Sequence, residues 1–230
     1  MTPLLSFHKL LGVEMVDKEM REPLFDFLDE YFGKIRTIEE KIIRKSRADV
    51  LGITDGSVLG FEIKSDSDTY ERLKTQIKDY DKFCDYCYVV VGKSHTHVAE
   101  HIPDYWGIII IEPGKEPVMS REAAPSPKVK LKYQMELLWK RELHNILQRN
   151  ALPAYKDKSR KFISDKLTEK LDEGILKRQL TDQLFERDYT VFDKEDGEPK
   201  KVSFKKTTTG IKVRRRPRTY TKHVIRKKKR

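Results

Sequence analysis

The chain has 230 residues, of which 37% are hydrophobic and 37% are charged, and its formal net charge is +11. That length suits one domain with an appendage or two small domains, with enough apolar residues for a core of ordinary size. No run approaches the roughly 18 apolar residues of a membrane span, the first residues do not resemble a secretion signal, and two cysteines do not make a disulfide scaffold. We therefore expect a cytoplasmic protein, in a bacterial or phage-infected cell, that makes no contact with membranes.

The chain begins with a predicted helix and a predicted strand. Residues 14–32 place apolar side chains near helical spacing and end at Gly33, which is typical of a helix and its C-terminal stop. Residues 35–43 are expected to form a strand. Glu39 and Glu40 are neighbours on this strand and are therefore expected to point to opposite faces.

A hairpin follows over residues 47–64, where two apolar runs flank Asp55-Gly56, a dipeptide typical of tight turns. Four polar residues share one face of this hairpin in the register that the turn sets, as two opposed pairs: Asp49 with Glu62, and Arg47 with Lys64. Opposed carboxylates repel each other, and a divalent cation between them would remove that cost. The alternative is a solvated cross-strand salt network that binds no metal.

Beyond the hairpin, Asp68 and Glu71 resemble the start of a helix that runs to about residue 83 and carries Gln76 near its apolar face. Two continuous apolar runs then predict buried strands, with a short helix between them. These three segments are residues 86–91, 95–102 and 106–111. The resulting order predicts an α/β fold with a central mixed sheet flanked by helices.

Residues 112–128 contain four prolines and mark a boundary, with the linker itself at 116–128. A helical module is predicted at 129–190, with one helix near 131–147 and two more within 158–187, divided near Glu173-Gly174. Basic residues at the start of the second of these helices would suit DNA binding. The alternative is that the helices simply pack on the preceding body.

The end of the chain is strongly basic. Residues 200–230 hold fifteen Lys and Arg and no Asp or Glu, whereas the rest of the chain holds 33 basic and 37 acidic side chains. We predict a basic, flexible tail at 191–230 that binds phosphate backbone regardless of sequence. The residues expected to contact nucleic acid are Arg47, Lys212, Arg214, Arg215, Arg216 and Arg218.

Asp49, followed by Glu62-Ile63-Lys64, resembles the core motif of the PD-(D/E)XK nuclease superfamily. The continuation from Ser65 to Thr69, with Gln76 on the next helix, is similar to a bacterial and phage branch of that superfamily. Ala48 stands where the superfamily often has its name-giving proline. The resemblance implies a restriction-endonuclease-like core over residues 1–115 and metal-dependent hydrolysis of DNA.

In that interpretation Asp49 and Glu62 hold Mg²⁺ or Mn²⁺, and the resemblance implies the Ile63 carbonyl as a third ligand. Lys64 has an ordinary pKa of about 10.4, so we expect it to act as a donor that orients water or stabilises charge on the phosphate. The resemblance places Gln76 over the same site, whereas a solvent-facing glutamine is the alternative.

Other acidic residues are weaker candidates. Glu40 is expected to approach a second metal position, and Glu19 on the first helix is a further candidate. Asp66 is expected to act as a cap or an outer ligand, and Asp68 as a helix cap. For Glu40, Glu39 and Glu19 the alternative is an ordinary surface charge.

Cys84 and Cys87 have the spacing of a zinc-binding pair, and His95 and His97 follow. A structural zinc site needs four ligands in one geometry, and this pair spans a helix end and a strand start. We therefore expect partly buried thiols in preference to a zinc site.

The sequence predicts an Mg²⁺- or Mn²⁺-dependent deoxyribonuclease. The alternative is a catalytically silent nucleic-acid-binding or phage accessory protein on a nuclease fold, with a host or phage protein as a further partner. The sequence does not choose between endonuclease and exonuclease activity, or between single- and double-stranded DNA.

Overall fold

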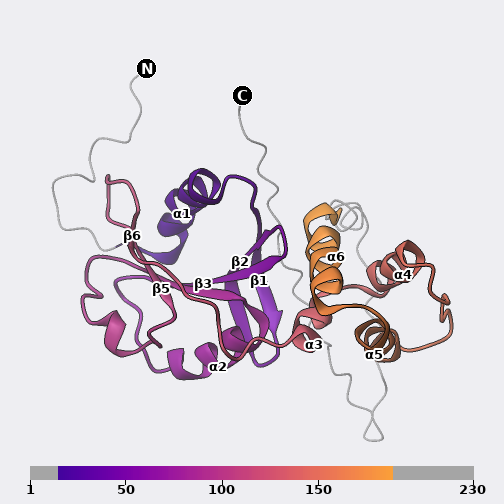
Figure 1. Ribbon diagram of the computed structural model, residues 1–230. Coiled ribbons are helices and arrows are strands. Elements are labelled where there is room, and N and C mark those ends of the chain that lie inside the picture. Colours follow the sequence, from indigo (N-terminus) through magenta and orange to yellow (C-terminus); the bar gives the residue numbers. More distant parts are fainter. Residues whose placement is uncertain (1–14, 189–230) are drawn as a thin grey trace, which may run out of the picture.

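The computed structural model describes residues 15–188. Six strands form one mixed sheet in the order β1-β2-β3-β4-β5-β6. Strands β1 to β3 are antiparallel, β3 to β5 are parallel, and β6 returns antiparallel to β5. The strands are β1 (Arg36–Ile43), β2 (Ser46–Thr54), β3 (Ser57–Lys64), β4 (Tyr86–Val91), β5 (Gly107–Ile110) and β6 (Val118–Arg121). This is the α/β fold with a mixed sheet that the sequence predicts (Figure 1).

Helices cover the sheet and extend beyond it (Figure 1). The α-helices are α1 (Asp17–Phe32), α2 (Leu73–Phe83), α3 (Leu131–Gln134), α4 (Lys140–Arg149), α5 (Arg160–Lys170) and α6 (Glu173–Glu186). Two short 3₁₀ turns complete the described elements: η3 (Val98–Glu100) and η4 (Met135–Leu137). No helix of the described residues is long and apolar enough to cross a membrane.

The hairpin has the register that its turn residues predict. Thr54 pairs with Ser57 across Asp55-Gly56, and the pairing continues to Val50 and Phe61. Gly56 has a φ of +72°, a left-handed conformation that glycine adopts without steric cost. The turn chemistry therefore sets which residues of the two strands face each other.

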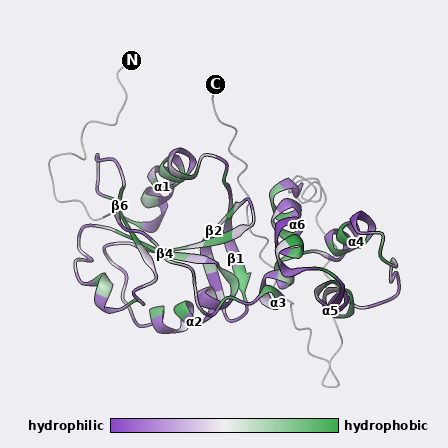
Figure 2. Ribbon diagram, in the orientation of Figure 1, coloured by the Kyte–Doolittle hydropathy of each residue, from purple (hydrophilic) through white to green (hydrophobic). Residues whose placement is uncertain are grey.

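Each face of the sheet has its own apolar core. One core packs against α1 and contains Val50, Phe61, Ile63 and Tyr88, with the Phe61 and Tyr88 rings stacked at 5.1 Å. The other core runs continuously from the opposite face of the sheet through α2 to the C-terminal helices. Figure 2 shows this apolar character on the strands of the sheet and on parts of the C-terminal helices.

The C-terminal helices also make polar contacts with the hairpin and the strand beside it. The Gly56 N–H donates to Thr181 Oγ1 on α6 at 3.0 Å, and Lys177 on the same helix pairs with Asp85. These contacts agree with packing of the helices on the preceding body.

Several element boundaries differ from the expectation. Residues 118–121, within the segment predicted as a linker, form the edge strand β6. The single helix expected near 131–147 is divided, because Leu138 takes an extended conformation and is fully buried. The short helix expected at 95–102 is reduced to the 3₁₀ turn η3.

Helix α2 begins at Leu73, five residues after the start expected at Asp68. Asp68 instead accepts hydrogen bonds from the Ser65 N–H at 2.8 Å and from the Ser65 hydroxyl at 2.7 Å. Its carboxylate therefore stabilises the turn that follows β3, and it does not cap the helix.

Candidate active site

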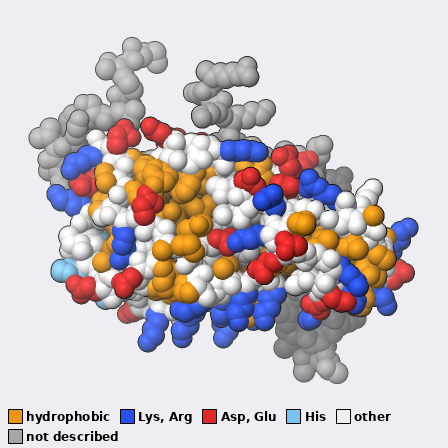
Figure 3. All heavy atoms as spheres, viewed as in Figure 1, with side chains coloured by type: hydrophobic (Ala, Val, Ile, Leu, Met, Phe, Trp, Pro, Cys, Tyr) orange, Lys and Arg blue, Asp and Glu red, His pale blue; other side chains and the backbone are white. Residues whose placement is uncertain are grey.

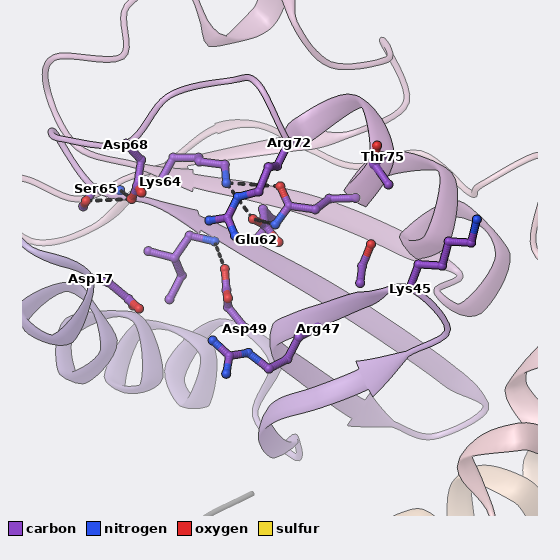
Figure 4. A pocket seen from close by; sticks show the side chains of 13 residues that line it. Asp17, Lys45, Arg47, Asp49, Glu62, Lys64, Ser65, Asp68, Arg72 and Thr75 are labelled. Atoms are coloured by element: carbon purple, nitrogen blue, oxygen red, sulfur yellow. Dashed lines mark hydrogen bonds and ion pairs between the residues drawn. The ribbon is translucent and has the colours of Figure 1, made fainter. Parts of the chain in front are cut away.

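A pocket of about 530 Å³ opens where the start of β2, the end of β3 and helix α2 meet (Figure 4). Its lining combines acidic, basic and amide side chains. The lining residues are Asp17, Lys45, Ser46, Arg47, Asp49, Glu62, Ile63, Lys64, Ser65, Asp68, Arg72, Thr75 and Gln76. The pocket thus brings together Asp49, Glu62, Ile63, Lys64 and Gln76.

Asp49 lies where the β2–β3 ladder ends. The last pair of this ladder is Val50 with Phe61. The residue before Val50 is Asp49, and its carboxylate accepts the Ile63 N–H at 2.9 Å. The Asp49 N–H donates to the Tyr80 hydroxyl at 3.1 Å, and that hydroxyl donates to the Phe61 carbonyl at 3.2 Å. These contacts hold the Asp49 carboxylate against β3, at the Glu62 end of the hairpin.

Glu62 and Lys64 are almost completely buried, with 1% and 3% of their surfaces exposed. The Lys64 ammonium donates to Glu62 Oε1 at 2.8 Å and to Gln76 Oε1 at 3.2 Å. The Gln76 side-chain amide also donates to Glu62 Oε1. Helix α2 therefore places Gln76 over the paired Glu62 and Lys64, and its side chain does not extend into solvent.

The second oxygen of the Glu62 carboxylate receives no hydrogen bond of good geometry, although the Tyr80 hydroxyl lies near this carboxylate. Among the described residues, Glu62 Oε2 is a buried carboxylate oxygen without a partner. A buried charged oxygen that lacks a partner costs free energy unless a proton or a cation neutralises it. The structure thus contains an acceptor position that the residues around it do not fill.

The raised pKa values of the two carboxyl groups are a second indication of a cation site. Burial raises the pKa of Asp49, and the neighbouring charge of Glu62 raises it further. Burial likewise raises the pKa of Glu62, although the positive charge of Lys64 opposes this. Two adjacent carboxyl groups repel each other when both are ionised, which raises their pKa values. A divalent cation bound between them removes that repulsion.

The residues present fit Mg²⁺ or Mn²⁺ with two protein carboxylates. Within residues 15–188, no three His, Cys, Asp or Glu side chains gather closely enough to hold a metal ion by themselves. Magnesium, however, is commonly bound by one or two carboxylates that water and phosphate oxygens complete. Asp49 and Glu62 would hold such an ion, with Ile63 beside them in the pocket.

Arg47 lies on the rim of the pocket, and its pairing differs from the predicted network. Its guanidinium pairs with Glu40 at 2.6 Å, and its side chain is 66% exposed. No ion pair within the described part of the chain joins Arg47 to Asp49 or Glu62. A solvated salt network across the hairpin therefore does not form.

Glu40 is not among the residues that line the pocket. The Arg21 guanidinium contacts Glu39 at 2.9 Å and Glu40 at 2.7 Å, so these neighbours share one cation. The expectation that they point to opposite faces is wrong, because Glu40 has a φ of +54°, which interrupts the strand alternation. The structure therefore places Glu40 in a network of arginine ion pairs beside the site.

Glu19 accepts the Val16 N–H at 3.2 Å and caps the start of α1. Asp66 accepts backbone N–H groups from Met15 and Ser94, both at 3.1 Å, and so connects three segments of the chain. Neither residue lines the pocket.

Three charged pocket residues were not predicted from the sequence: Asp17, Lys45 and Arg72. Asp17 comes from the first turn of α1, where it pairs with Arg21 at 2.9 Å. Lys45 belongs to the β1–β2 turn, and Arg72 directly precedes α2. None of them belongs to a motif: Lys45 directly precedes β2, whereas packing of α1 and α2 brings Asp17 and Arg72 to the hairpin.

His95, Cys84 and Cys87 are buried away from this pocket. His95 hydrogen-bonds to the Tyr70 hydroxyl at 2.6 Å and to the Ser65 carbonyl at 2.7 Å, so it supports the loop that follows Lys64. Both cysteines are free thiols, and burial raises the pKa of Cys87 well above its usual range. The predicted contacts at Lys212, Arg214, Arg215, Arg216 and Arg218 lie outside the described residues.

Comparison with known proteins gives one family and one structure. The family model described as bacteriophage P4 protein cII matches residues 16–195. A solved structure, the SPO1766 protein of unknown function from Silicibacter pomeroyi, is 20% identical with a TM-score of 0.43. That similarity covers 64% of this chain and 99% of the other. Among curated proteins, none matches the chain.

Proposed function

The chain belongs to the family of bacteriophage P4 protein cII, and we propose that it acts as a metal-dependent nuclease that hydrolyses DNA phosphodiester bonds. The observation that carries the proposal is the unpartnered, buried Oε2 of Glu62 in a pocket that also contains Asp49 and Lys64. The order of these residues along the hairpin is also the order of the PD-(D/E)XK motif.

Asp49 and Glu62 would hold Mg²⁺ or Mn²⁺, because hard cations prefer carboxylate oxygens. When bound, such an ion would polarise a phosphoryl oxygen and would lower the pKa of a water molecule bound to it, so that hydroxide forms more readily at neutral pH. The Ile63 N–H fixes one oxygen of Asp49 at 2.9 Å, which orients the carboxylate before any ligand arrives. Tyr80 supports the same arrangement through the Asp49 N–H.

Lys64 supplies a buried positive charge beside the carboxylates. Its contacts with Glu62 and Gln76 hold the ammonium in one position, where it can donate to water or to a phosphate oxygen. During hydrolysis the water oxygen bonds to phosphorus, the bond to the leaving sugar oxygen breaks, and the proton lost by water passes to that oxygen through solvent. Gln76 orients Lys64 and Glu62 during this exchange.

Basic side chains around the pocket would bind the DNA backbone. Lys45, Arg47 and Arg72 line its rim, above an acidic floor of Asp49 and Glu62. Cations at the rim attract phosphate and offset its repulsion from the carboxylates. The strongly basic segment at residues 200–230 would add affinity that does not depend on sequence.

A second candidate function is a catalytically silent phage accessory protein that binds nucleic acid. The family match favours it, because the family's description names a phage protein and no activity. In this alternative the protein has the fold of a nuclease but does not cleave DNA.

The test is a cleavage assay on the full chain with single- and double-stranded DNA, in Mg²⁺, Mn²⁺ or EDTA. We expect cutting in either metal, none in EDTA, and a loss of at least about a hundredfold in the Glu62→Gln variant. Glu100→Gln is the matched control, because Glu100 is exposed and, among residues 15–188, its ion pair is with His97 at 3.0 Å.

Thermal melting shows whether each variant is folded. If the folded parent binds DNA but cuts neither substrate in either metal, the accessory function replaces the nuclease. If Glu62→Gln cuts as fast as the parent, Glu62 is not part of the catalytic machinery.

A further inference from the structure

A second pocket, of about 560 Å³, lies between the β1–β2 turn and the C-terminal helices. The residues that matter here come from the turn, from α3 and from α5. They are Arg44, Lys132, Tyr133, Arg160, Lys161 and Asp165. None of these residues belongs to the candidate active site.

The lining of the second pocket carries an excess of positive charge. Asp165 is already paired with Lys161 at 2.6 Å. Arg44, Lys132 and Arg160 are exposed, and within the described part of the chain none of them forms an ion pair. Glu136 also lines the pocket, but Arg160 donates to its backbone carbonyl at 2.6 Å, and no ion pair within the described residues joins its carboxylate to these cations. The lining therefore has four cations against two carboxylates, and this excess indicates a site for a polyanion.

Tyr133 positions two of these cations. Its ring lies 4.8 Å from the Arg44 guanidinium and 5.1 Å from the Lys132 ammonium. Phe83 packs on the same ring at 5.8 Å. With these three neighbours the ring serves as a support for charged groups and not as an open platform for a stacked base, so the pocket suits phosphate groups.

Lys41, on β1 close to the turn, lies near one of these cations. Its pKa is lowered to about 8, mainly by burial and to a smaller extent by the charges of Arg187 and Arg160, against the opposing charge of Glu142. Figure 3 shows lysine and arginine side chains in a row along the lower edge of the molecule, over α2 and toward α3.

The β1–β2 turn connects the two pockets. Lys45 lines the first pocket, and its neighbour Arg44 lines the second. Asp79 on α2 holds this turn in place, because its carboxylate accepts the Ser46 N–H at 3.0 Å and the Ser46 hydroxyl at 2.9 Å. Two adjacent cations are thus fixed so that each serves a different pocket.

We propose that the second pocket binds phosphate groups of duplex DNA, along a backbone that passes over the β1–β2 turn into the candidate active site. Arg44, Lys132 and Arg160 are the groups that neutralise phosphate. The inference rests on the proposed function only in that the same DNA enters the first pocket. Because the contacts are to backbone, the second pocket does not select a base sequence.

The test measures duplex binding by the full chain in EDTA, with fluorescence anisotropy across salt concentrations of about 50 to 200 mM. The variant combines Arg44→Gln, Lys132→Gln and Arg160→Gln. The matched control combines Lys18→Gln, Lys93→Gln and Lys170→Gln, which removes the same charge from exposed residues outside both pockets.

Losing three phosphate contacts lowers the slope of log affinity against log salt by about 2.7 and weakens binding at least about tenfold. We expect this in the pocket variant and less than a twofold change in the control. Each single substitution should lower the slope by about 0.9, which guards against a triple variant that does not fold.

Equal losses in the two triple variants would overturn the proposal, because net charge alone would then explain binding. Unchanged binding in the pocket variant would also overturn it. A parent that binds duplex through the second pocket but never cuts leaves this inference standing while the nuclease fails. If the parent cuts DNA and the pocket variant binds and cuts equally well, the nuclease proposal stands and this inference fails.

Discussion

Replacing Asp49 with Asn should stabilise the metal-free protein at neutral pH. The pKa of Asp49 is raised from 3.8 to about 8, first by burial and then by the charge of Glu62. The unfolded chain ionises this group near its ordinary pKa, so folding at pH 7 must either take up a proton or bury a second negative charge. Asparagine removes that penalty and can still accept the Ile63 N–H.

The size of the effect follows from linkage. Each pKa unit corresponds to about 1.4 kcal/mol, so the interval between the ordinary pKa and pH 7 gives an upper limit of about 4 kcal/mol. Asp49 lines an open pocket where solvent screens its charge, so we expect the variant to gain about 1–3 kcal/mol. A raised carboxyl pKa contributes stability that is complete below the unfolded pKa and is lost as pH rises through the folded pKa. The advantage of asparagine should therefore shrink to about a third at pH 5.

Urea unfolding in EDTA at the two pH values measures this difference, and the same titration in Mg²⁺ measures the metal response. A metal at 100 times its Kd stabilises the folded state by about 2.7 kcal/mol, a gain we expect in the parent and not in Asp49→Asn. Asp157→Asn is the control, because Asp157 is exposed and outside the pocket.

Two results would refute this reasoning. If Asp49→Asn is less stable than the parent at pH 7 in EDTA, the carboxylate is stabilised by its surroundings and not penalised. If Mg²⁺ stabilises the variant as much as the parent, the metal binds elsewhere.

Two further predictions concern the fold around the site. Gly60→Ala should lower the free energy of unfolding by about 1–3 kcal/mol in urea titrations, since the new Cβ would lie 2.5 Å from Tyr80 Cδ1 and 2.6 Å from Cys84 Sγ; an unchanged midpoint would mean that α2 moves away freely. Arg187→Met should cost about 3–5 kcal/mol, because it leaves the buried Glu142 carboxylate, now 2.6 Å from the guanidinium, without its cation. Adding Glu142→Gln should recover much of that loss, and a double variant no more stable than the single one would contradict this account.

Local chemistry was sufficient to predict the hairpin and most strands. The Asp55-Gly56 turn sets the pairing of β2 with β3, which the structure confirms from Thr54–Ser57 to Val50–Phe61. A tight turn leaves few choices of register. A shift by one residue would move the β3 side chains to the opposite faces of the sheet, so that Glu62 and Lys64 would enter the apolar core that packs against α1. For this reason the sequence alone determined that Asp49 and Glu62 lie at the same end of one hairpin.

Boundaries that depend on distant contacts were not predictable in the same way. The extended break at Leu138 is stabilised by burial of that residue in the core shared with the sheet. Strand β6 forms because its residues meet β5. Neither segment carries a local turn or capping signal strong enough to predict these outcomes.

The surroundings of the candidate site were likewise decided by tertiary structure. Asp17, Lys45 and Arg72 lie on separate segments, and no spacing along the chain relates them to Glu62. Glu40, a strand residue by its sequence, is diverted by its positive φ and by Arg21 from a neighbouring helix. Sequence specifies contacts between residues that are close along the chain, because backbone geometry relates them directly. Contacts between remote segments depend on how helices and sheet pack, and only the folded structure shows them.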